Sequence, residues 1–182
     1  MAGRPEQACP DQILGIGPLS DPYRGYDQLG SDPFLFDGNP DPRLPAMERV
    51  VGVGGDEDPV AVPATALTEA GVVEVDVSGR AVVVWALDGL NSALDAEQIP
   101  EGRPIGASWA FDPVLDGHRL TFTRVGEDGY IDTETRSVWN IFGLAVSGPL
   151  AGSPLDPVDH TDTFWFAWAA FHPDTRIADV GT

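Results

Sequence analysis

The sequence has little sulfur and no lysine: its 182 residues include one cysteine, Cys9, and all ten basic residues are arginine. One cysteine excludes an internal disulfide and any metal site built from several thiolates. Against the ten arginines stand 29 acidic residues, so the formal net charge is -19. A charge of this size and sign repels phosphate backbones, and we expect no nucleic-acid partner. The same acidity fits a salt-rich environment or an ordinary GC-rich genome, and both origins stay open.

Long hydrophobic runs are also missing. The longest apolar candidate, Phe164 to Phe171, is far shorter than the roughly 20 residues that a membrane-spanning helix needs, so we expect no membrane span. Residues 1–12 lack the hydrophobic centre of a signal peptide. The chain as given therefore indicates a soluble, cytoplasmic protein. The pair Ala8-Cys9 weakly resembles the cleavage point of a lipoprotein precursor, so an exported origin stays open.

The residues that are present point to one globular domain. Hydrophobic residues make up 42% of the chain, which excludes disorder throughout. Residues 1–45 differ because they hold eight of the 17 prolines, and proline disfavours both helix and central strand. We predict an extended, proline-rich arm over residues 1–45 and a single globular domain over residues 46–182. We expect Phe34 and Phe36 to anchor the arm on the body, on a second subunit or on a protein partner.

The pattern after residue 46 predicts an α+β fold, mainly antiparallel β-sheet, with a roll or barrel-like shape. The continuous apolar run Ala81 to Trp85 is typical of a strand covered on both faces. The expected elements are a hairpin of residues 49–53 and 60–62, a helix at 63–70, strands at 72–77 and 81–85, a second hairpin of 107–111 and 120–124, a strand at 129–132, and two short strands between 138 and 148.

A short, buried C-terminal helix is predicted over residues 162–171. Asp162 or Thr163 can cap its first turn, and Pro173 ends it. Apolar side chains surround it nearly completely, so we expect burial on more than one side. The apolar residues at helical spacing are Phe164, Ala167, Trp168 and Phe171.

Four segments occur in an order that is typical of one family. They are Val60-Ala-Val-Pro63 before a short helix and a Gly-Arg-Ala-Val-Val-Val strand; Phe111-Asp with Asp116-Gly-His-Arg-Leu-Thr-Phe122; Asp132-Thr-Glu-Thr-Arg-Ser-Val-Trp139; and Gly148-Pro-Leu-Ala-Gly152 followed by Trp168 and His172-Pro-Asp-Thr175. Together they resemble the bacterial and archaeal family known as domain of unknown function 3179, over about Arg49 to Ile177. The resemblance implies a shared fold, and export or lipid anchoring for many members, but no established activity.

The sequence departs from this family at one point. Many members carry a Cys-Pro-Leu-Cys segment after the central strand, and the resemblance implies a metal or redox site there. The corresponding region here is Trp85-Ala-Leu-Asp-Gly89 followed by an insertion to Gly106, and it contains no sulfur. We therefore expect a cysteine-free variant that cannot perform the chemistry of those cysteines.

A group of polar and indole side chains is the best candidate for a ligand site. Polar groups rimmed by indoles are typical of small-molecule pockets and equally of an ordinary core edge. The spacing of histidines and carboxylates matches no metal site, and no serine lies in a nucleophile elbow, so we expect no catalytic residue, metal or cofactor. The candidates are Trp85, Asp88, Asn91 and Ser92 at a strand end and in the following loop, together with Trp139, Asn140 and His160.

These observations favour a non-catalytic binding or protein-interaction module. The alternative is an enzyme or redox accessory protein that uses His160 with loop carboxylates. His160 is central to the choice, because a lone histidine either hydrogen-bonds a loop carbonyl or serves as a ligand or general base.

Overall fold

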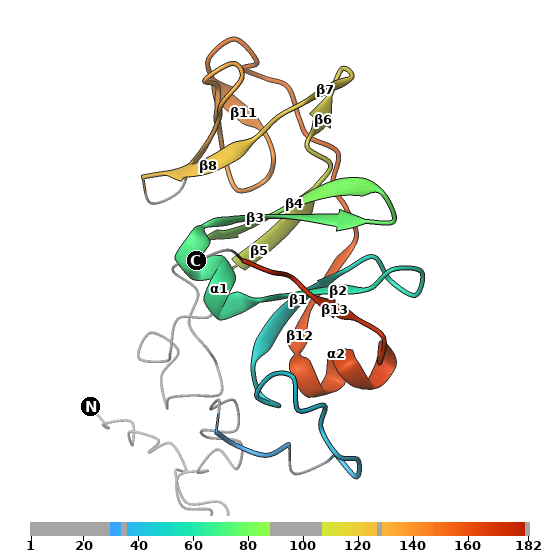
Figure 1. The fold of residues 1–182 in the computed structure, drawn as a ribbon. Coiled ribbons are helices and arrows are strands. Elements are labelled where there is room, and N and C mark those ends of the chain that lie inside the picture. The colour runs from blue at the N-terminus through green and yellow to red at the C-terminus, as the bar shows by residue number, and fades with distance from the viewer. Residues whose placement is uncertain (1–29, 34–35, 88–106, 127–128, 181–182) are drawn as a thin grey trace, which may run out of the picture.

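The computed structural model describes residues 30–33, 36–87, 107–126 and 129–180, and its strands stack in layers (Figure 1). In chain order the elements are β1 (Arg49–Val53), β2 (Val60–Pro63), α1 (Ala64–Ala70), β3 (Val72–Val77), β4 (Arg80–Leu87), β5 (Ala107–Phe111), β6 (Val114–Leu115), β7 (His118–Arg119), β8 (Phe122–Val125), β9 (Gly129–Asp132), β10 (Val138–Trp139), β11 (Ala145–Ser147), β12 (His160–Phe164), α2 (Trp165–Phe171) and β13 (Arg176–Ile177).

Three sheets lie one above another in the orientation of Figure 1. The lower sheet has the strand order β12-β1-β2-β13, the middle sheet β3-β4-β5 and the upper sheet β11-β10-β9-β8, while β6 and β7 form a small separate hairpin. Strands pair in antiparallel fashion, except that β13 runs parallel to β2. The expectation of a mainly antiparallel β fold is therefore confirmed. The expectation of a barrel-like shape is wrong, because within the described residues these sheets remain separate layers and do not close into a barrel.

The middle sheet is covered on both faces, as the apolar run in β4 predicts. Successive side chains of a strand point to opposite faces. Val82 and Val84 accordingly pack in one hydrophobic cluster with valines of the lower sheet. Val83 and Trp85 pack in a second cluster with aromatic residues of the upper sheet. The middle sheet is thus the centre of the molecule, with one hydrophobic core on either side.

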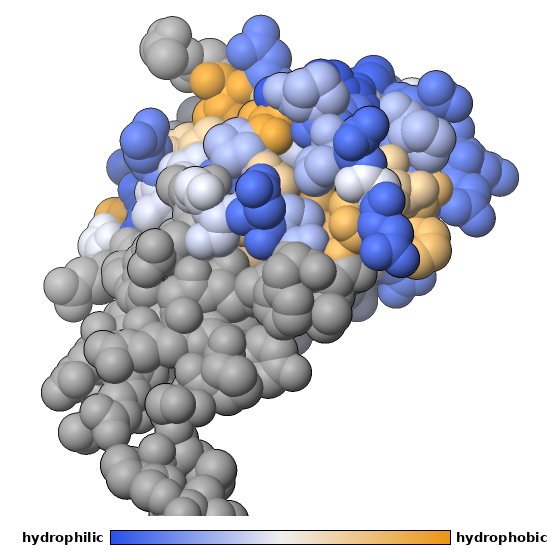
Figure 2. Space-filling view, turned by 90° about the horizontal axis from the view of Figure 1, so that it is seen from below, coloured by the Kyte–Doolittle hydropathy of each residue, from blue (hydrophilic) through white to orange (hydrophobic). Residues whose placement is uncertain are grey.

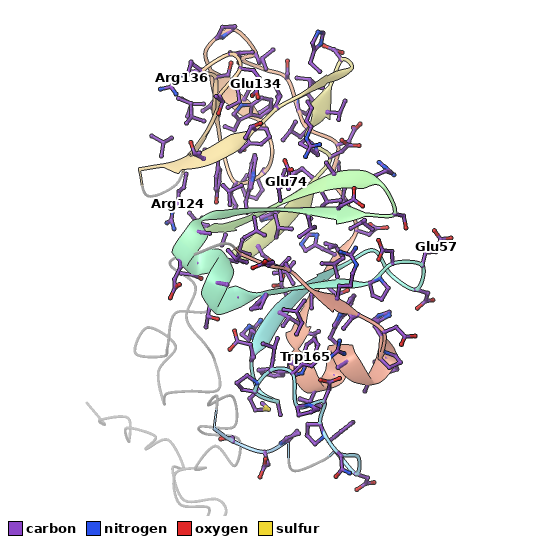
Figure 3. All side chains as sticks on the ribbon, in the orientation of Figure 1. Glu57, Glu74, Arg124, Glu134, Arg136 and Trp165 are labelled. Carbon is purple, nitrogen blue, oxygen red and sulfur yellow. The ribbon has the colours of Figure 1, made fainter. Side chains whose placement is uncertain are left out.

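Helix α1 also forms as the sequence predicts. Pro63 precedes its first residue, where the missing proline N–H costs no helical hydrogen bond. Gly71 ends the helix with a φ of 74° and donates its N–H to the Leu67 carbonyl at 2.7 Å. A Cβ atom on Gly71 would lie 2.8 Å from the Cβ of Arg124, which Figure 3 shows between β8 and α1. Glycine is therefore required both for the turn and for this close approach.

Helix α2 begins later than the sequence predicts. His160 to Phe164 form β12, which pairs with β1 along its whole length, and the helix starts at Trp165. The hydrogen bonds offered by β1 outweigh the capping that Asp162 or Thr163 could give. This shift changes which side chains face the core: Trp165, Trp168 and Ala169 are buried. Phe171 is 82% exposed, so the expectation that it is a core residue is wrong.

The second predicted hairpin is also wrong. Strand β5 pairs with β4, and β8 pairs with β9, so residues 107–111 and 120–124 belong to different sheets. The segment between them forms the small hairpin β6-β7 around Asp116 and Gly117, both with positive φ. The sequence correctly predicts the turn. The strands β5 and β8 on either side of it pair with β4 and β9 instead of with each other, because those pairings are longer than the hairpin β6-β7.

The described part of the predicted arm lies against α2. The Trp165 indole nitrogen donates to the Asp41 carbonyl at 3.0 Å, and Arg43 donates to the carbonyls of Thr175 and Pro173. The ring of Phe36 lies 5.4 Å from that of Phe166. Figure 2 views this side of the molecule and shows hydrophobic surface between hydrophilic side chains. Residues 1–29 and 34–35, including Phe34, lie outside the described residues.

Candidate functional site

Two of the predicted ligand residues, Trp85 and Trp139, are core residues. Both have 0% exposure and lie between the middle and upper sheets. Trp85 stacks on Tyr130 at 4.2 Å, and Phe122 contacts both indoles, at 5.3 Å and 5.6 Å. The Trp85 indole nitrogen has no hydrogen-bond partner among the described groups. The two indoles both contact the Phe122 ring, and they lie inside the protein rather than at its surface.

The Trp139 indole is held by a buried carboxylate, that of Asp132. Asp132 is 0% exposed, and its carboxylate accepts hydrogen bonds from the Trp139 Nε1 at 2.9 Å, the Ser137 N–H at 3.0 Å and both the N–H and the hydroxyl of Thr135. Burial raises the pKa of this carboxyl, but the bonds from Trp139, Thr135 and Ser137 outweigh that effect and hold its pKa below the usual value. The segment Asp132 to Trp139 is thus a structural unit. Figure 3 shows Glu134 in the turn between β9 and β10, and the Glu134 carboxylate accepts a hydrogen bond from the Thr121 N–H.

Asn140 shapes a turn. Its side-chain oxygen accepts the N–H groups of Phe142 and Leu144, at 3.0 Å and 3.1 Å. Gly143 follows with a φ of 74°, and a Cβ atom there would lie 2.5 Å from the Phe111 ring. The turn therefore packs tightly on the core while it holds the side chain of Phe142 outward, 66% exposed.

His160 lies at the first position of β12, partly buried. Its Nδ1 donates to the Val158 carbonyl oxygen at 3.1 Å. In a neutral ring that bond leaves Nε2 as a hydrogen-bond acceptor. The His160 ring lies 6.1 Å from that of Trp109 on β5, and the Trp109 ring lies 5.5 Å from that of Phe142. We call His160, Trp109 and Phe142 the aromatic row.

Ser108 and Asp162 add polar groups beside the aromatic row. The Ser108 hydroxyl lies 2.8 Å from both carboxylate oxygens of Asp162 and donates to that carboxylate. Asp162 is exposed, two residues along β12 from His160, and Ser108 precedes Trp109 on β5. The segment 88–106 joins β4 to β5, and Leu87 pairs with Ala107 where it leaves and returns. Asp88, Asn91 and Ser92 belong to this segment and lie outside the described residues.

Ser108, His160 and Asp162 are the residue types of a nucleophilic triad, but their hydrogen bonds differ from those of a triad. A triad requires the histidine to accept the proton of the serine hydroxyl. Here that hydroxyl is bonded to Asp162, and the His160 Nδ1 is bonded to the backbone. Metal binding has no support either: among the described residues no three His, Cys, Asp or Glu side chains are grouped to hold an ion. Nor is any helix in the described part of the chain long and apolar enough to cross a membrane.

Of the site residues predicted from the sequence, His160 belongs to the aromatic row and Asn140 shapes the turn that carries Phe142. Ser108, Trp109, Phe142 and Asp162, which the structure places beside His160, were not among the predicted site residues. Trp109 and Ser108 belong to no recognisable sequence motif. They lie near His160 and Asp162 because β12 runs past β5. Phe142 has a weak signal, because an Asn two residues before it and a Gly after it are typical of a turn. Asp162 was assigned to a helix cap, although it belongs to a strand.

The sequence was compared with curated proteins, with solved structures and with models of protein families. The comparison with curated proteins gave no match, and neither did the comparison with solved structures. A family model does match, over residues 19–175, which is most of the chain and includes every element from β1 to α2. The chain therefore belongs to the family described as protein of unknown function (DUF3179), as the resemblance in its sequence indicated.

Proposed function

We propose that this chain is a non-catalytic binding module that holds a small ligand on the aromatic row. The observation that carries the proposal is the arrangement of His160, Trp109 and Phe142 with ring centroids 5.5 Å and 6.1 Å apart. Leaving an aromatic ring exposed to water forgoes the favourable free energy that burial of the ring would give. The Phe142 ring is nevertheless held outward by the two hydrogen bonds of Asn140, so its exposure is built into the turn.

The polar groups beside the row define the kind of ligand. The Asp162 carboxylate is exposed and the His160 Nε2 accepts in the neutral ring, so both favour a ligand that donates hydrogen bonds. A net charge of -19 disfavours an anion. Aromatic rings attract organic cations and also cover the apolar faces of sugars and other flat molecules. We therefore propose a neutral or positively charged ligand with one apolar face.

The alternative, an enzyme or redox accessory protein that uses His160 with carboxylates, stays a second proposal. It requires the His160 Nε2 to take a proton from a substrate or a water, because the Ser108 hydroxyl is already bonded to Asp162. The alternative would be favoured by turnover of an activated ester, such as p-nitrophenyl acetate, that His160→Ala removes.

Three probes test the binding proposal on the full chain: choline as a cation, glucose as a neutral polyol and citrate as an anion. We expect choline or glucose, but not citrate, to shift the NMR signal of the Trp109 indole N–H. Phe142→Ala should abolish the shift, while Phe171→Ala, which removes another exposed ring, should leave it unchanged.

A second matched pair tests the carboxylate. Asp162→Asn should weaken the binding of choline, and Asp156→Asn, which removes an equal charge from an exposed neighbouring segment, should not. Absence of a response to all three probes, or an equal loss in Phe142→Ala and Phe171→Ala, would contradict the proposal.

A further inference from the structure

The upper sheet has one buried face and one outer face. Tyr130 and Trp139 are paired across β9 and β10, and both are buried against the middle sheet. Because strand side chains alternate, the residues next to them point the other way. Ile131 pairs with Val138 and with Thr123 on this opposite side. The outer face comprises Thr123, Val125, Ile131 and Val138, together with the exposed Leu144 and Val146, which flank the buried Ala145 opposite Trp139, and we call it the upper face.

No helix or strand of the described residues covers the upper face. Val125 is 43% exposed and Val146 is 54% exposed, although valine is normally buried. Figure 1 shows the upper sheet at the end of the stack, with the middle sheet on its inner side. The opposite end of the stack differs, because α2 covers the outer face of the lower sheet there.

The upper face is also uncharged, in a chain whose net charge is -19. Only two charged residues occur in its four strands, and neither points outward: Arg124 packs on Gly71, and Asp132 is buried. From Ser137 to Leu155 the sequence has no Asp, Glu, Lys, Arg or His. Figure 3 labels Glu134 and Arg136, one charge of each sign, in the turn between β9 and β10, while Glu127 and Asp128, between β8 and β9 in the sequence, lie outside the described residues. Among the residues that the structure describes, no carboxylate therefore lies on this open, apolar sheet face.

We infer that the upper face is covered by the upper face of a second copy of this chain. Two copies with 19 net negative charges each repel one another, so they can approach closely only through a surface without carboxylates. A basic partner would instead be drawn to the acidic remainder of the surface. An apolar, uncharged face is complementary to itself, which a twofold interface requires. Two such sheets pack face to face about 10 Å apart and bury their valines between them.

The oligomeric state of the full chain tests this inference, by sedimentation velocity over a range of protein concentrations in molar potassium chloride. Salt screens the repulsion between the acidic surfaces, so we expect a dimer that dissociates as salt is lowered. Val125→Asp places a carboxylate on the upper face and should weaken the dimer about tenfold or more, because like charges then meet across the interface. Val146→Asp should act in the same way.

Val114→Asp is the matched control. Val114 is 43% exposed, as Val125 is, but it lies on β6, outside the upper sheet. This variant should dimerise like the wild type, and circular dichroism should show that all three variants are folded. A chain that stays monomeric at high salt and high concentration overturns the inference, whether the face is then open or covered by a different protein. Equal weakening by Val114→Asp and Val125→Asp overturns it too.

Discussion

The lower and upper sheets end the same stack of layers, yet their outer faces are different surfaces. The lower sheet has Gly52 beneath the Trp168 ring, where a Cβ atom would lie 2.2 Å from a ring carbon. That space lets α2 press its indoles onto Val50 and Ala61. The upper sheet has β-branched residues at most outward positions, and no described helix lies on them. In the lower sheet, a glycine under a large ring makes room for a helix of the same chain. In the upper sheet, uncharged β-branched residues leave a face that a second copy can cover, as we infer above.

The two sheets also differ in how they are held. Buried indoles fix the cover of the lower sheet: Trp165 is 0% exposed, and the Trp168 indole donates to the Thr175 hydroxyl at 2.9 Å. The upper sheet relies on a buried charge, because the Asp132 carboxylate ties together the β9–β10 turn and Trp139. The lower sheet should therefore respond most to the loss of apolar volume, and the upper sheet most to the loss of one carboxylate.

The largest expected effect is on the lower sheet. Trp168→Ala should lower the free energy of unfolding by about 3–5 kcal/mol, because a buried aromatic side chain leaves a cavity that the sheet cannot fill. Phe171→Ala, on the same helix but 82% exposed, should change it by less than about 0.5 kcal/mol. Urea unfolding of both variants measures the difference. Equal losses would mean that α2 packs on the sheet in another orientation.

The next effect concerns the upper sheet. Asp132→Ala should lower the free energy of unfolding by about 3 kcal/mol, because the N–H groups of Ser137, Thr135 and Trp139 lose their acceptor inside the protein. Glu134→Ala is the control, because the exposed Glu134 carboxylate accepts one N–H, that of Thr121. A similar small loss in both variants would contradict a structural role for Asp132.

Acid should weaken the upper sheet through the same carboxylate. The pKa of Asp132 is lower in the folded chain than its unfolded value of about 3.9. A group with a lowered folded pKa stabilises the fold above the unfolded pKa, and that contribution is lost as the pH falls through the folded pKa. Stability should therefore decline below about pH 4, less steeply in Asp132→Asn.

Asp41 and Asp58 also contribute to this acid loss. The Arg43 guanidinium lowers the pKa of Asp41, and the Ser78 N–H together with Arg176 lowers that of Asp58. The informative quantity is therefore the difference between the wild type and Asp132→Asn, measured by urea unfolding at several pH values. Parallel curves would show that Asp132 does not titrate in this range.

The smallest expected effect is that of salt on the folded chain. Repulsion among the carboxylates disfavours the compact state, and added salt screens it. Surface ion pairs, such as that of Arg176 with Asp58, offset this repulsion only slightly, because water and salt screen them. Raising potassium chloride to the molar range should raise the melting temperature by roughly 2–4 °C, the shift expected for about 1 kcal/mol in a chain of this size. A flat or falling curve would show that surface charge does not limit stability.

The local features of the fold could be predicted from the sequence, because they depend on neighbouring residues. The run from Ala81 to Trp85 identified a strand covered on both faces, and Pro63 and Gly71 fixed the ends of α1. The start of α2 could not be predicted, because helical spacing in residues 162–171 competes with a ladder offered by β1, over one hundred residues earlier in the chain. Pairing partners that distant are not encoded in local periodicity.

The candidate site was predictable only in part, for the same reason. His160 and Asn140 attract attention as a lone histidine and a turn residue. Trp109 and Phe142 join His160 only because the segment that leads into β12 meets β5, at the bridge between Phe111 and Pro157. Trp85 and Trp139 were chosen for their indoles, but alternation along β4 and β10 directs both into the core.

Thiol labelling tests the difference between the two outer faces most directly. In a Cys9→Ser background, three variants each place one cysteine in the stack: Ala61→Cys beneath α2, Val146→Cys on the upper face and Val114→Cys on β6. The account predicts that Ala61→Cys reacts slowly at every protein concentration and Val114→Cys rapidly at every concentration, whereas Val146→Cys changes from rapid to slow as the protein concentration rises in molar salt. Rapid labelling of Val146→Cys at all concentrations would contradict it, as would rapid labelling of Ala61→Cys in the folded chain.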